Sequence, residues 1–567
     1  MDSKGVRVPV KQEDEDEHFE DEVVVQATTV VGDGGGEDMA VMKGETQPPA
    51  FRDWPFAVLF LVQVAAIAIT AMSFGPAWVA SLTQTTDEGS SILLDDDAPS
   101  NYENTGDDAV NRFLSDGDKR SWTAADSVLF AVGAFFAASV VVMLVFRTML
   151  HHPLQSIKIS FFVAPVTFGA VALLILAASA PSDSSDQGDV HHTIVGSFWV
   201  MAAVFSCVSL CYWYCYKRFM PFAAVNLKAA LTAVRANMGL FFLSVGSLFV
   251  IYAWSILWGI AMAGIVYHDQ QKDQVPCSDV YNDDYTEHPG MCDQQPNVVA
   301  VTVLVLCFYW TQQVIQNTIH TTTAGAVGSW WVQPIDPDSN YDGGCCGVDT
   351  TDSLYRSCTY SFGSICFGSL LVAIMQTLES MARNNRNRRD ILSMVIQCLI
   401  ICLRSWLEYF NSWSFAYVGI YGYDYLTAGR KVIELFKARG WTILITDRLV
   451  FRVLLMANLG SAAVSGLVCV TIMFFLGFNK FRNDEWAAAL VVAFWVGFVI
   501  GLIISNTVLF VVESAVRTVM ICFAEQPAMD PQCAQPILQE LKQTYAATYP
   551  DVFRFSRDAE MESRNVV

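Results

Sequence analysis

Long uncharged apolar runs alternate with short, highly charged connectors along most of the chain. About ten of these runs reach the roughly 20 residues that a helix needs to cross the hydrocarbon core of a bilayer. They lie at residues 54–78, 124–147, 158–180, 193–215, 238–266, 298–327, 356–379, 391–418, 450–477 and 486–513. The pattern predicts an all-α polytopic membrane protein with about ten transmembrane helices.

Two of the connectors have an amphipathic pattern. Residues 228–237 and 425–441 each place apolar side chains on one face of a short helix. The apolar positions are Leu227, Leu231 and Val234 in the first, and Leu426, Val432, Leu435 and Phe436 in the second. We expect both segments to form short helices that lie in the membrane interface.

Composition supports this interpretation and excludes other classes. The 567 residues are 53% hydrophobic and 16% charged, with a mean hydropathy of +0.36. Soluble domains carry roughly 25% charged residues. The formal net charge is −22, and the acids are gathered in the N-terminal segment and in connectors. These features exclude a soluble enzyme, a disordered chain and a nucleic-acid binder, and they predict the lipid bilayer as a partner.

The distribution of Lys and Arg predicts the orientation. Connectors 216–237 and 419–449 are basic and are expected in the cytoplasm, whereas connectors 79–123, 181–192 and 267–297 are acidic and are expected outside. Both termini are then cytoplasmic. The arginines at 383, 386, 388 and 389 disagree, because ten simple crossings place them outside.

Three domains are expected from the same pattern. Residues 1–50 are acidic and poor in aromatic side chains, which predicts a disordered cytoplasmic N-terminal tail. Residues 51–525 form a transmembrane transporter domain, and residues 526–567 form a cytoplasmic C-terminal tail.

The sixth apolar run contains polar side chains at helical spacing. Trp310, Gln313, Asn317, His320 and Ala324 follow a 3-4-3-4 pattern and share one stripe of a helix. Polar side chains within a span face a protein interior or a cavity, because their exposure to lipid is costly. The stripe is either the wall of a permeation path or an interhelical hydrogen-bond seam.

The eighth run contains an acid, Glu408, among Trp406, Tyr409 and Trp413. Aromatic faces and a negative charge are the groups that hold a quaternary ammonium. On a regular helix these four side chains point in different directions. Glu408 therefore either works with aromatics from other spans, or the helix is interrupted near Asn411. Alternatively, Arg404 at i−4 simply neutralises Glu408.

The sequence gives weaker signals for a few other candidate residues. Tyr252 and Trp254 in the fifth run are either members of the cation site or lipid-facing bulk. Glu513 and Arg517, four residues apart, favour a structural ion pair. Nucleotide-binding, serine-hydrolase and zinc-protease fingerprints do not occur in the sequence. We therefore expect no catalytic residues, no metal site, no cofactor and no enzymatic activity.

Several long segments resemble the signature blocks of the choline transporter-like family, solute carrier family 44, especially its fungal and protist branch. These blocks are FYWTQQVIQNTIHTTTAGAVGSWW, SFGSICFGSLLVAIMQTLE, YVGIYGYDYLTAGRKVIELFKARGW and VRTVMICFAEQP, together with FRDWPFAVLFLVQ before the first span. The resemblance covers roughly residues 51–530. It implies a ten-helix transporter with cytoplasmic termini that takes up choline, with ethanolamine as a related substrate, without sodium.

We therefore expect a facilitated transporter in the plasma membrane for choline or a related organic cation, driven by the substrate gradient and the membrane potential. Two alternatives remain open at this point. One is a transporter of a different organic cation or a thiamine-type ester. The other is a non-transporting membrane scaffold or receptor. The first outer connector, which is short, acidic and free of cysteine, departs from that of the animal members of the family.

A disulfide between Cys277 and Cys292 is a prediction of the sequence alone. Both residues lie in the acidic connector between the fifth and sixth runs, which the orientation places in an oxidising exterior. Mass spectrometry of the non-reduced protein should recover the two peptides linked. Recovery of free thiols at both positions would contradict the bond and weaken the assigned orientation.

Overall fold

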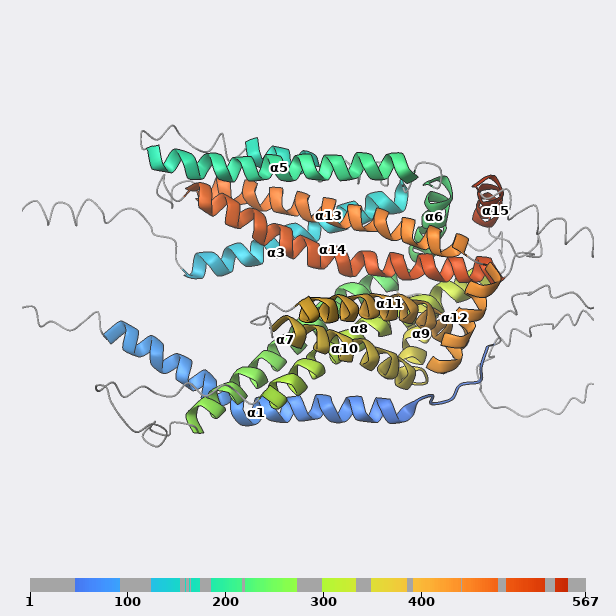
Figure 1. Ribbon diagram of the computed structural model, residues 1–567, viewed down its shortest axis with the longest axis horizontal. Coiled ribbons are helices and arrows are strands. Elements are labelled where there is room, and N and C mark those ends of the chain that lie inside the picture. The colour runs from blue at the N-terminus through green and yellow to red at the C-terminus, as the bar shows by residue number, and fades with distance from the viewer. Residues whose placement is uncertain are drawn as a thin grey trace, which may run out of the picture. The chain divides into compact units, whose positions relative to one another are not determined.

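The computed structural model describes residues 46–91, 124–152, 185–216, 220–272, 298–332, 348–384, 391–439, 441–477, 486–525 and 536–548, and part of 155–173. All regular structure in these residues is helical, which confirms the all-α class. The helices are α1 (Trp54–Ser91), α3 (Ala124–His151), α5 (Ser185–Tyr216), α6 (Met220–Ala236), α7 (Gly239–Lys272), α8 (Val298–Val332), α9 (Val348–Cys358), α10 (Phe362–Asn384), α11 (Ile391–Tyr421), α12 (Tyr425–Arg439), α13 (Trp441–Gly477), α14 (Trp486–Glu525) and α15 (Pro536–Thr548) (Figure 1).

Within the described part of the chain, seven helical segments are long and apolar enough to cross a membrane. They are Trp54–Ser81, Phe130–His151, Gly239–Asp269, Val299–Val332, Phe362–Arg383, Val450–Phe475 and Ala489–Glu525. A helix satisfies its own backbone hydrogen bonds, which lipid cannot do. The protein is therefore a multi-pass membrane protein.

Three predicted runs are not among these seven segments. Run 193–215 lies in α5, in whose described residues the apolar stretch is Gly196–Val208. Run 391–418 lies in α11, which carries Arg404 and Glu408. Most of run 158–180 lies outside the described residues. The seven segments agree with seven of the predicted runs, and ten crossings remain a prediction.

The helix boundaries differ from the prediction at three places. The run predicted from residue 356 begins at Phe362, because the polar helix α9 ends at Cys358 and the chain turns at 359–361. Helix α13 begins at Trp441 rather than 450, and α14 continues past 513 to Glu525. With 40 residues, α14 is about 60 Å long, twice the thickness of the hydrocarbon core.

Helices α13 and α14 pack closely because small residues line their contact. A Cβ atom at Gly501 would lie 2.5 Å from the Cβ of Ser465, and one at Gly497 would lie 2.5 Å from Cys469 Sγ. Ser461 also donates a hydrogen bond to Ser505 across the contact, at 2.6 Å. Small residues serve this purpose in membranes, where close van der Waals packing replaces the hydrophobic effect.

Helix α14 also contacts α8, α11, α7, α6 and α3. One of these contacts fixes its position against the polar part of α8, because Ser514 Oγ donates a hydrogen bond to His320 O at 3.0 Å. Helices α8, α10 and α11 pack on one another, and α1 packs on α7 and α10. Polar residues on α8, α10, α11, α13 and α14 can therefore meet.

The amphipathic connectors form the short helices α6 and α12, as predicted. The apolar face of α6, however, is buried in the protein: Leu227, Leu231 and Val234 are at most 2% exposed, and α6 packs on α14 and α15. On α12, Val432 and Leu435 are buried, whereas Leu426 is 59% exposed. Lys228 of α6 pairs with Glu540 of α15 at 2.7 Å. A lipid-facing position is not required for an amphipathic face when other helices cover it.

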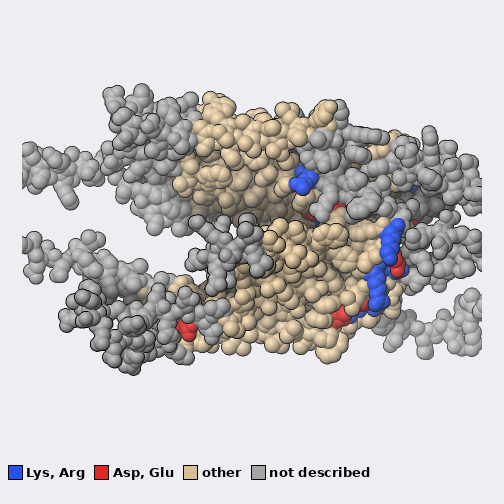
Figure 2. Space-filling view, viewed as in Figure 1, with Lys and Arg blue, Asp and Glu red and all other residues tan. Residues whose placement is uncertain are grey.

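Helices α6, α12 and α15 lie at the same end of the view in Figure 1. In Figure 2 the Lys and Arg side chains that are visible lie toward this end, while most of the described surface is uncharged. On α12, a hydrogen bond from Lys431 to Glu434 raises the pKa of the ammonium, so it stays charged at neutral pH. This distribution is typical of a cytoplasmic membrane end.

Candidate functional site

A cavity of about 620 Å³ lies among α8, α10, α11, α13 and α14. Its lining combines amides, aromatic rings, three acids and two arginines. The lining residues are Phe308, Tyr309, Gln312, Gln313, Gln316, Asn317, His320, Val372, Gln376, Arg404, Ser405, Glu408, Tyr409, Asn411, Ser412, Asp447, Phe451, Phe510, Glu513 and Arg517. A wall of this polarity inside apolar helices can hold a polar or charged molecule away from lipid.

Helix α8 supplies most of the amides. Gln313, Gln316, Asn317 and His320 are three or four residues apart, so they share one face of α8, and Gln312 lies beside them. This face meets the cavity because its exposure to hydrocarbon would leave the amides without hydrogen-bond partners. The cost of polar groups in lipid thus sets the rotation of α8 about its axis.

Two members of this face also connect helices. Asn317 Nδ2 donates to Ser369 Oγ of α10 at 2.9 Å, and His320 Nε2 donates to Ser412 O of α11 at 2.6 Å. Because a carbonyl oxygen only accepts, the proton of this bond lies on Nε2. The stripe thus lines the cavity and also forms a hydrogen-bond seam between helices. Its role as the wall of a permeation path stays a prediction.

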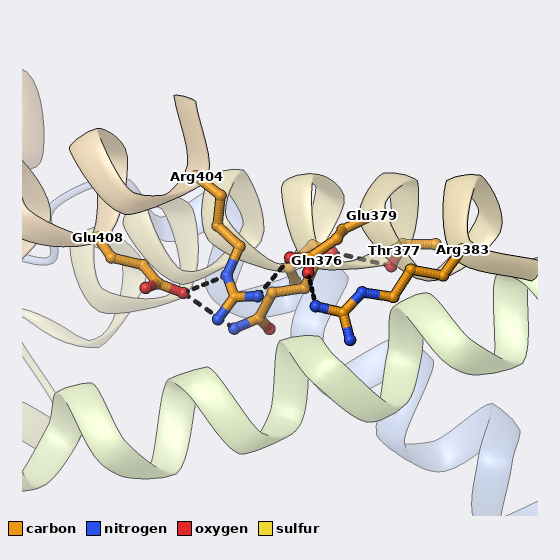
Figure 3. A network of polar contacts seen from close by, with 7 residues as sticks. Gln376, Thr377, Glu379, Arg383, Arg404 and Glu408 are labelled. Carbon is orange, nitrogen blue, oxygen red and sulfur yellow. Dashed lines mark hydrogen bonds and ion pairs between the residues drawn. The ribbon is translucent and has the colours of Figure 1, made fainter. Parts of the chain in front are cut away.

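A network of two acids and two arginines joins α10 and α11 (Figure 3). Arg404 Nε pairs with Glu408 Oε1 at 2.8 Å, and the same guanidinium pairs with Glu379. Glu379, which is 5% exposed, also pairs with Arg383. Gln376 Nε2 donates a further hydrogen bond to Glu408 Oε1 at 3.2 Å. The formal charges of this network cancel.

The network also explains part of the conflict between the predicted orientation and the arginines at 383, 386, 388 and 389. Arg383 is the first of the arginines that the ten-helix pattern places outside, and its charge is balanced by Glu379 within α10. A paired arginine at a helix end carries little information about orientation. The other three, at 386, 388 and 389, lie outside the described residues.

A second network joins α13 and α14. Arg517, only 5% exposed, pairs with Glu513 one turn before it, as the sequence predicted. Its Nε also lies 3.4 Å from Asp447 Oδ1 of α13. Here two carboxylates share one guanidinium, so the formal charge of the network is −1.

The structure separates the nine predicted substrate-binding residues into two groups. Gln313, Asn317, His320, Glu408 and Tyr409 line the same cavity, although they come from the two predicted segments on α8 and α11. Their approach depends on the packing of α8 against α11.

The other four do not line this cavity, and their part in substrate binding stays a prediction. Trp406 is 76% exposed and Tyr252 is 68% exposed on the outer surface of the described chain. Trp254 is buried among apolar residues of α1, α7 and α8. Trp310 donates Nε1–H to Cys366 O at 3.0 Å and packs on Phe60. The apolar bulk of a tryptophan fits lipid or a helix contact equally well, so its type alone does not place it.

Helix α11 is continuous from Ile391 to Tyr421, so the alternative of an interruption near Asn411 is excluded. Glu408 and Tyr409 face the cavity, whereas Trp413 is fully buried beside Phe436. Of the three aromatic residues near Glu408 in the sequence, only Tyr409 lines the cavity, and the other aromatic rings of its lining come from other helices. Among described residues, no group of three or more His, Cys, Asp or Glu could hold a metal ion.

Sequence reasoning missed Asp447, Phe451 and Phe510. Asp447 was assigned to a basic connector, but α13 begins six residues earlier and brings it into the bundle. The available signal was its spacing: Asp447 and Phe451 are four residues apart and share one face of a helix. Phe510 and Glu513 have the corresponding spacing of three on α14.

Cys277 and Cys292 lie outside the described residues, so their disulfide remains a prediction.

Comparison with known proteins gives one family. The family model described as "Plasma-membrane choline transporter" matches residues 199–528, more than half of the chain. This range contains α8, α10, α11, α13 and α14, and hence every residue that lines the cavity.

Individual relatives are fungal and amoebal proteins. "Protein PNS1" of Gibberella zeae is 29% identical over 64% of this chain and 65% of its own length. "Protein PNS1" of Saccharomyces cerevisiae is 25% identical over 92% of this chain and 87% of its own length. A "CTL-like protein" of Dictyostelium discoideum is 27% identical over 58% of this chain and 53% of its own length. The aligned part thus spans slightly over half to most of the length of these relatives.

The shared guanidinium of Arg404 generates a prediction on stability. Arg404→Gln leaves Glu408 without its ion-pair partner and leaves buried Glu379 with Arg383 alone. We expect a loss of about 1–3 kcal/mol, between the values for buried and exposed pairs, because Arg404 is one-third exposed. The double variant Arg404→Gln/Glu408→Gln should recover part of this loss, since it removes the unpaired carboxylate. Thermal melting of the purified protein in detergent measures both, and a single variant that melts like the wild type would contradict the structural role.

Proposed function

Because the chain belongs to the choline transporter-like family, we propose that it is a plasma-membrane facilitator that carries choline or a related organic cation, such as ethanolamine, through the cavity. Transport follows the substrate gradient and the membrane potential, without a coupled ion. The termini are cytoplasmic, and residues 51–525 form the transporter domain between the cytoplasmic tails 1–50 and 526–567.

The observation that carries this proposal is the charge of the cavity wall. Glu408, Asp447 and Glu513 face only two guanidiniums, those of Arg404 and Arg517, so the lining has one excess negative charge. In a low-dielectric bundle, a monovalent cation is the ligand that neutralises it. The amides of α8 provide hydrogen-bond partners for a hydroxyl group or an N–H of the same molecule.

The size of the cavity does not decide which organic cation is the substrate. About 620 Å³ lies in the range of pockets for drug-sized ligands, well above the need of choline alone. A larger cation, such as a thiamine-type ester, is therefore the second candidate. A non-transporting scaffold is disfavoured, because a scaffold has no need of charged and amide side chains around an internal cavity.

Uptake of labelled choline into proteoliposomes tests the proposal. An inside-negative potential of 100 mV contributes about 2.3 kcal/mol per charge, which corresponds to roughly 50-fold accumulation of a monovalent cation. We expect uptake to scale with a potassium diffusion potential and to proceed without sodium. Ethanolamine and a thiamine ester serve as alternative labelled substrates in the same vesicles.

Empty liposomes and vesicles clamped at zero potential are the controls. Transport of a thiamine ester but not of choline would show that the substrate is the ester. The assignment as an organic-cation transporter would still hold. If none of these cations enters vesicles that contain folded protein, the transporter assignment fails and the scaffold alternative gains support.

Access to the α8 face provides an independent prediction. A cysteine at Gln313 should react with aqueous thiol reagents, measured against the unsubstituted protein as background, and excess choline should slow the reaction. A cysteine at Ala324 is the matched control: it lies on the same predicted stripe but is fully buried and does not line the cavity. If the cysteine at position 313 is as unreactive as the one at position 324, the stripe is a packing seam only. If it reacts but no organic cation slows the reaction, the face is open to water but does not bind the substrate.

A further inference from the structure

The two charge networks around the cavity differ in balance. Glu379 and Glu408 are matched by Arg383 and Arg404, and each guanidinium is in contact with a carboxylate. Asp447 and Glu513, by contrast, share a single guanidinium among the described residues, that of Arg517. The excess negative charge of the lining therefore belongs to the α13–α14 network, and not to Glu408.

Within that network, Asp447 is the carboxylate with the weaker partner. The closest guanidinium nitrogen lies 3.4 Å from Oδ1, longer than a normal charge-assisted hydrogen bond, whereas Glu513 makes a close hydrogen bond to Arg517 Nη2. No hydrogen bond of normal length to Asp447 Oδ2 forms among the described residues, although the Tyr409 hydroxyl interacts with this carboxylate. The side chain is 2% exposed and lines the cavity. A buried carboxylate oxygen of this kind is costly unless a cation is next to it.

Aromatic rings accompany Asp447 in the cavity wall. Phe451 lies one helical turn after it on α13, and Tyr409 of α11 lies beside it. Phe510 of α14 lies one turn before Glu513, with its ring centroid 5.8 Å from that of His320. Three helices thus bring aromatic rings to the wall that contains the excess charge.

We propose that Asp447 is the counter-ion of the bound organic cation, with Phe451, Phe510 and Tyr409 providing the ring faces, and that Glu408 is not. A quaternary ammonium has no N–H to donate, so aromatic faces and a nearby negative charge are its complement. Asp447 has both in the cavity wall, whereas the Glu408 carboxylate is already paired with Arg404. This assignment rests on the proposed function and specifies where in the cavity the cation is bound.

Equilibrium binding to the purified full-length protein tests the assignment. Two ligands are compared: choline, and the neutral 3,3-dimethylbutan-1-ol, in which carbon replaces the quaternary nitrogen. Asp447→Asn keeps the shape of the side chain and removes its charge. We expect choline binding to weaken roughly 5- to 150-fold, while binding of the neutral alcohol stays within about twofold. A residue with a purely structural role would change both ligands together.

Two further variants provide the comparison. Asp352→Asn makes the same chemical change at an exposed position on α9, away from the cavity, and should leave choline binding as in the wild type. The double variant Arg404→Gln/Glu408→Gln removes the Arg404–Glu408 ion pair and leaves the excess negative charge of the Asp447–Glu513–Arg517 network in place. It should weaken choline binding far less than Asp447→Asn does.

Each outcome decides the assignment. If Asp447→Asn binds choline normally, the proposal is wrong. If the Arg404→Gln/Glu408→Gln variant loses choline binding instead, the counter-ion is Glu408. If Asp447→Asn does not fold, Phe451→Leu and Phe510→Leu take its place. Each substitution should weaken choline binding by roughly 2- to 30-fold and leave binding of the neutral alcohol unchanged. An unchanged ratio of the two dissociation constants overturns the proposal.

Failure of the proposed function gives a different result. Suppose that wild-type protein melts cooperatively but binds none of four cations: choline, ethanolamine, tetramethylammonium and thiamine. Both the transporter assignment and the counter-ion assignment are then wrong. If it binds one of these cations and Asp447→Asn binds that cation equally well, only the counter-ion assignment falls.

Discussion

A charged side chain within a membrane-spanning helix is costly unless another charge lies against it, and the arrangement of α10, α11, α13 and α14 follows from this cost. Arg404 on α11 is in contact with Glu379 of α10, and Arg517 on α14 is close to Asp447 of α13. Each of these contacts joins two helices at one rotation about their axes. The amides of α8 face the interior that these four helices enclose, because the alternative for them is exposure to lipid.

Small residues allow close approach at several of the helix contacts around this interior. Gly497 and Gly501 allow α14 to approach α13, and a Cβ at Gly325 of α8 would lie 3.2 Å from the Gly419 carbonyl oxygen of α11. Such contacts depend on shape, since lipid is as apolar as a leucine side chain and gives no hydrophobic gain. The result is a bundle that is tight at these crossings and retains a cavity of about 620 Å³ where the polar side chains meet.

Charge balance distinguishes the two networks that contribute to this cavity. The network at Glu408 is neutral, so it contributes to helix–helix contact and little to the attraction of a cation. The network at Asp447 has one excess negative charge, in a wall that also contains phenylalanine rings. A transporter has to release its substrate as well as bind it, and one uncompensated charge with aromatic faces is a moderate attraction compared with several unpaired carboxylates.

The sequence by itself determined the helical class, most of the apolar spans and the polar stripe at Gln313, Asn317 and His320, because helical periodicity and the cost of polar groups in lipid are local properties. It also indicated the pairs Arg404–Glu408 and Glu513–Arg517, since residues four apart meet on any helix. Only the tertiary structure decided that Trp406 and Tyr252 face outward and that Trp310 is a packing residue. It also brought Asp447 into the bundle, because the start of α13 and the partner of Arg517 are set by contacts between helices far apart in the chain.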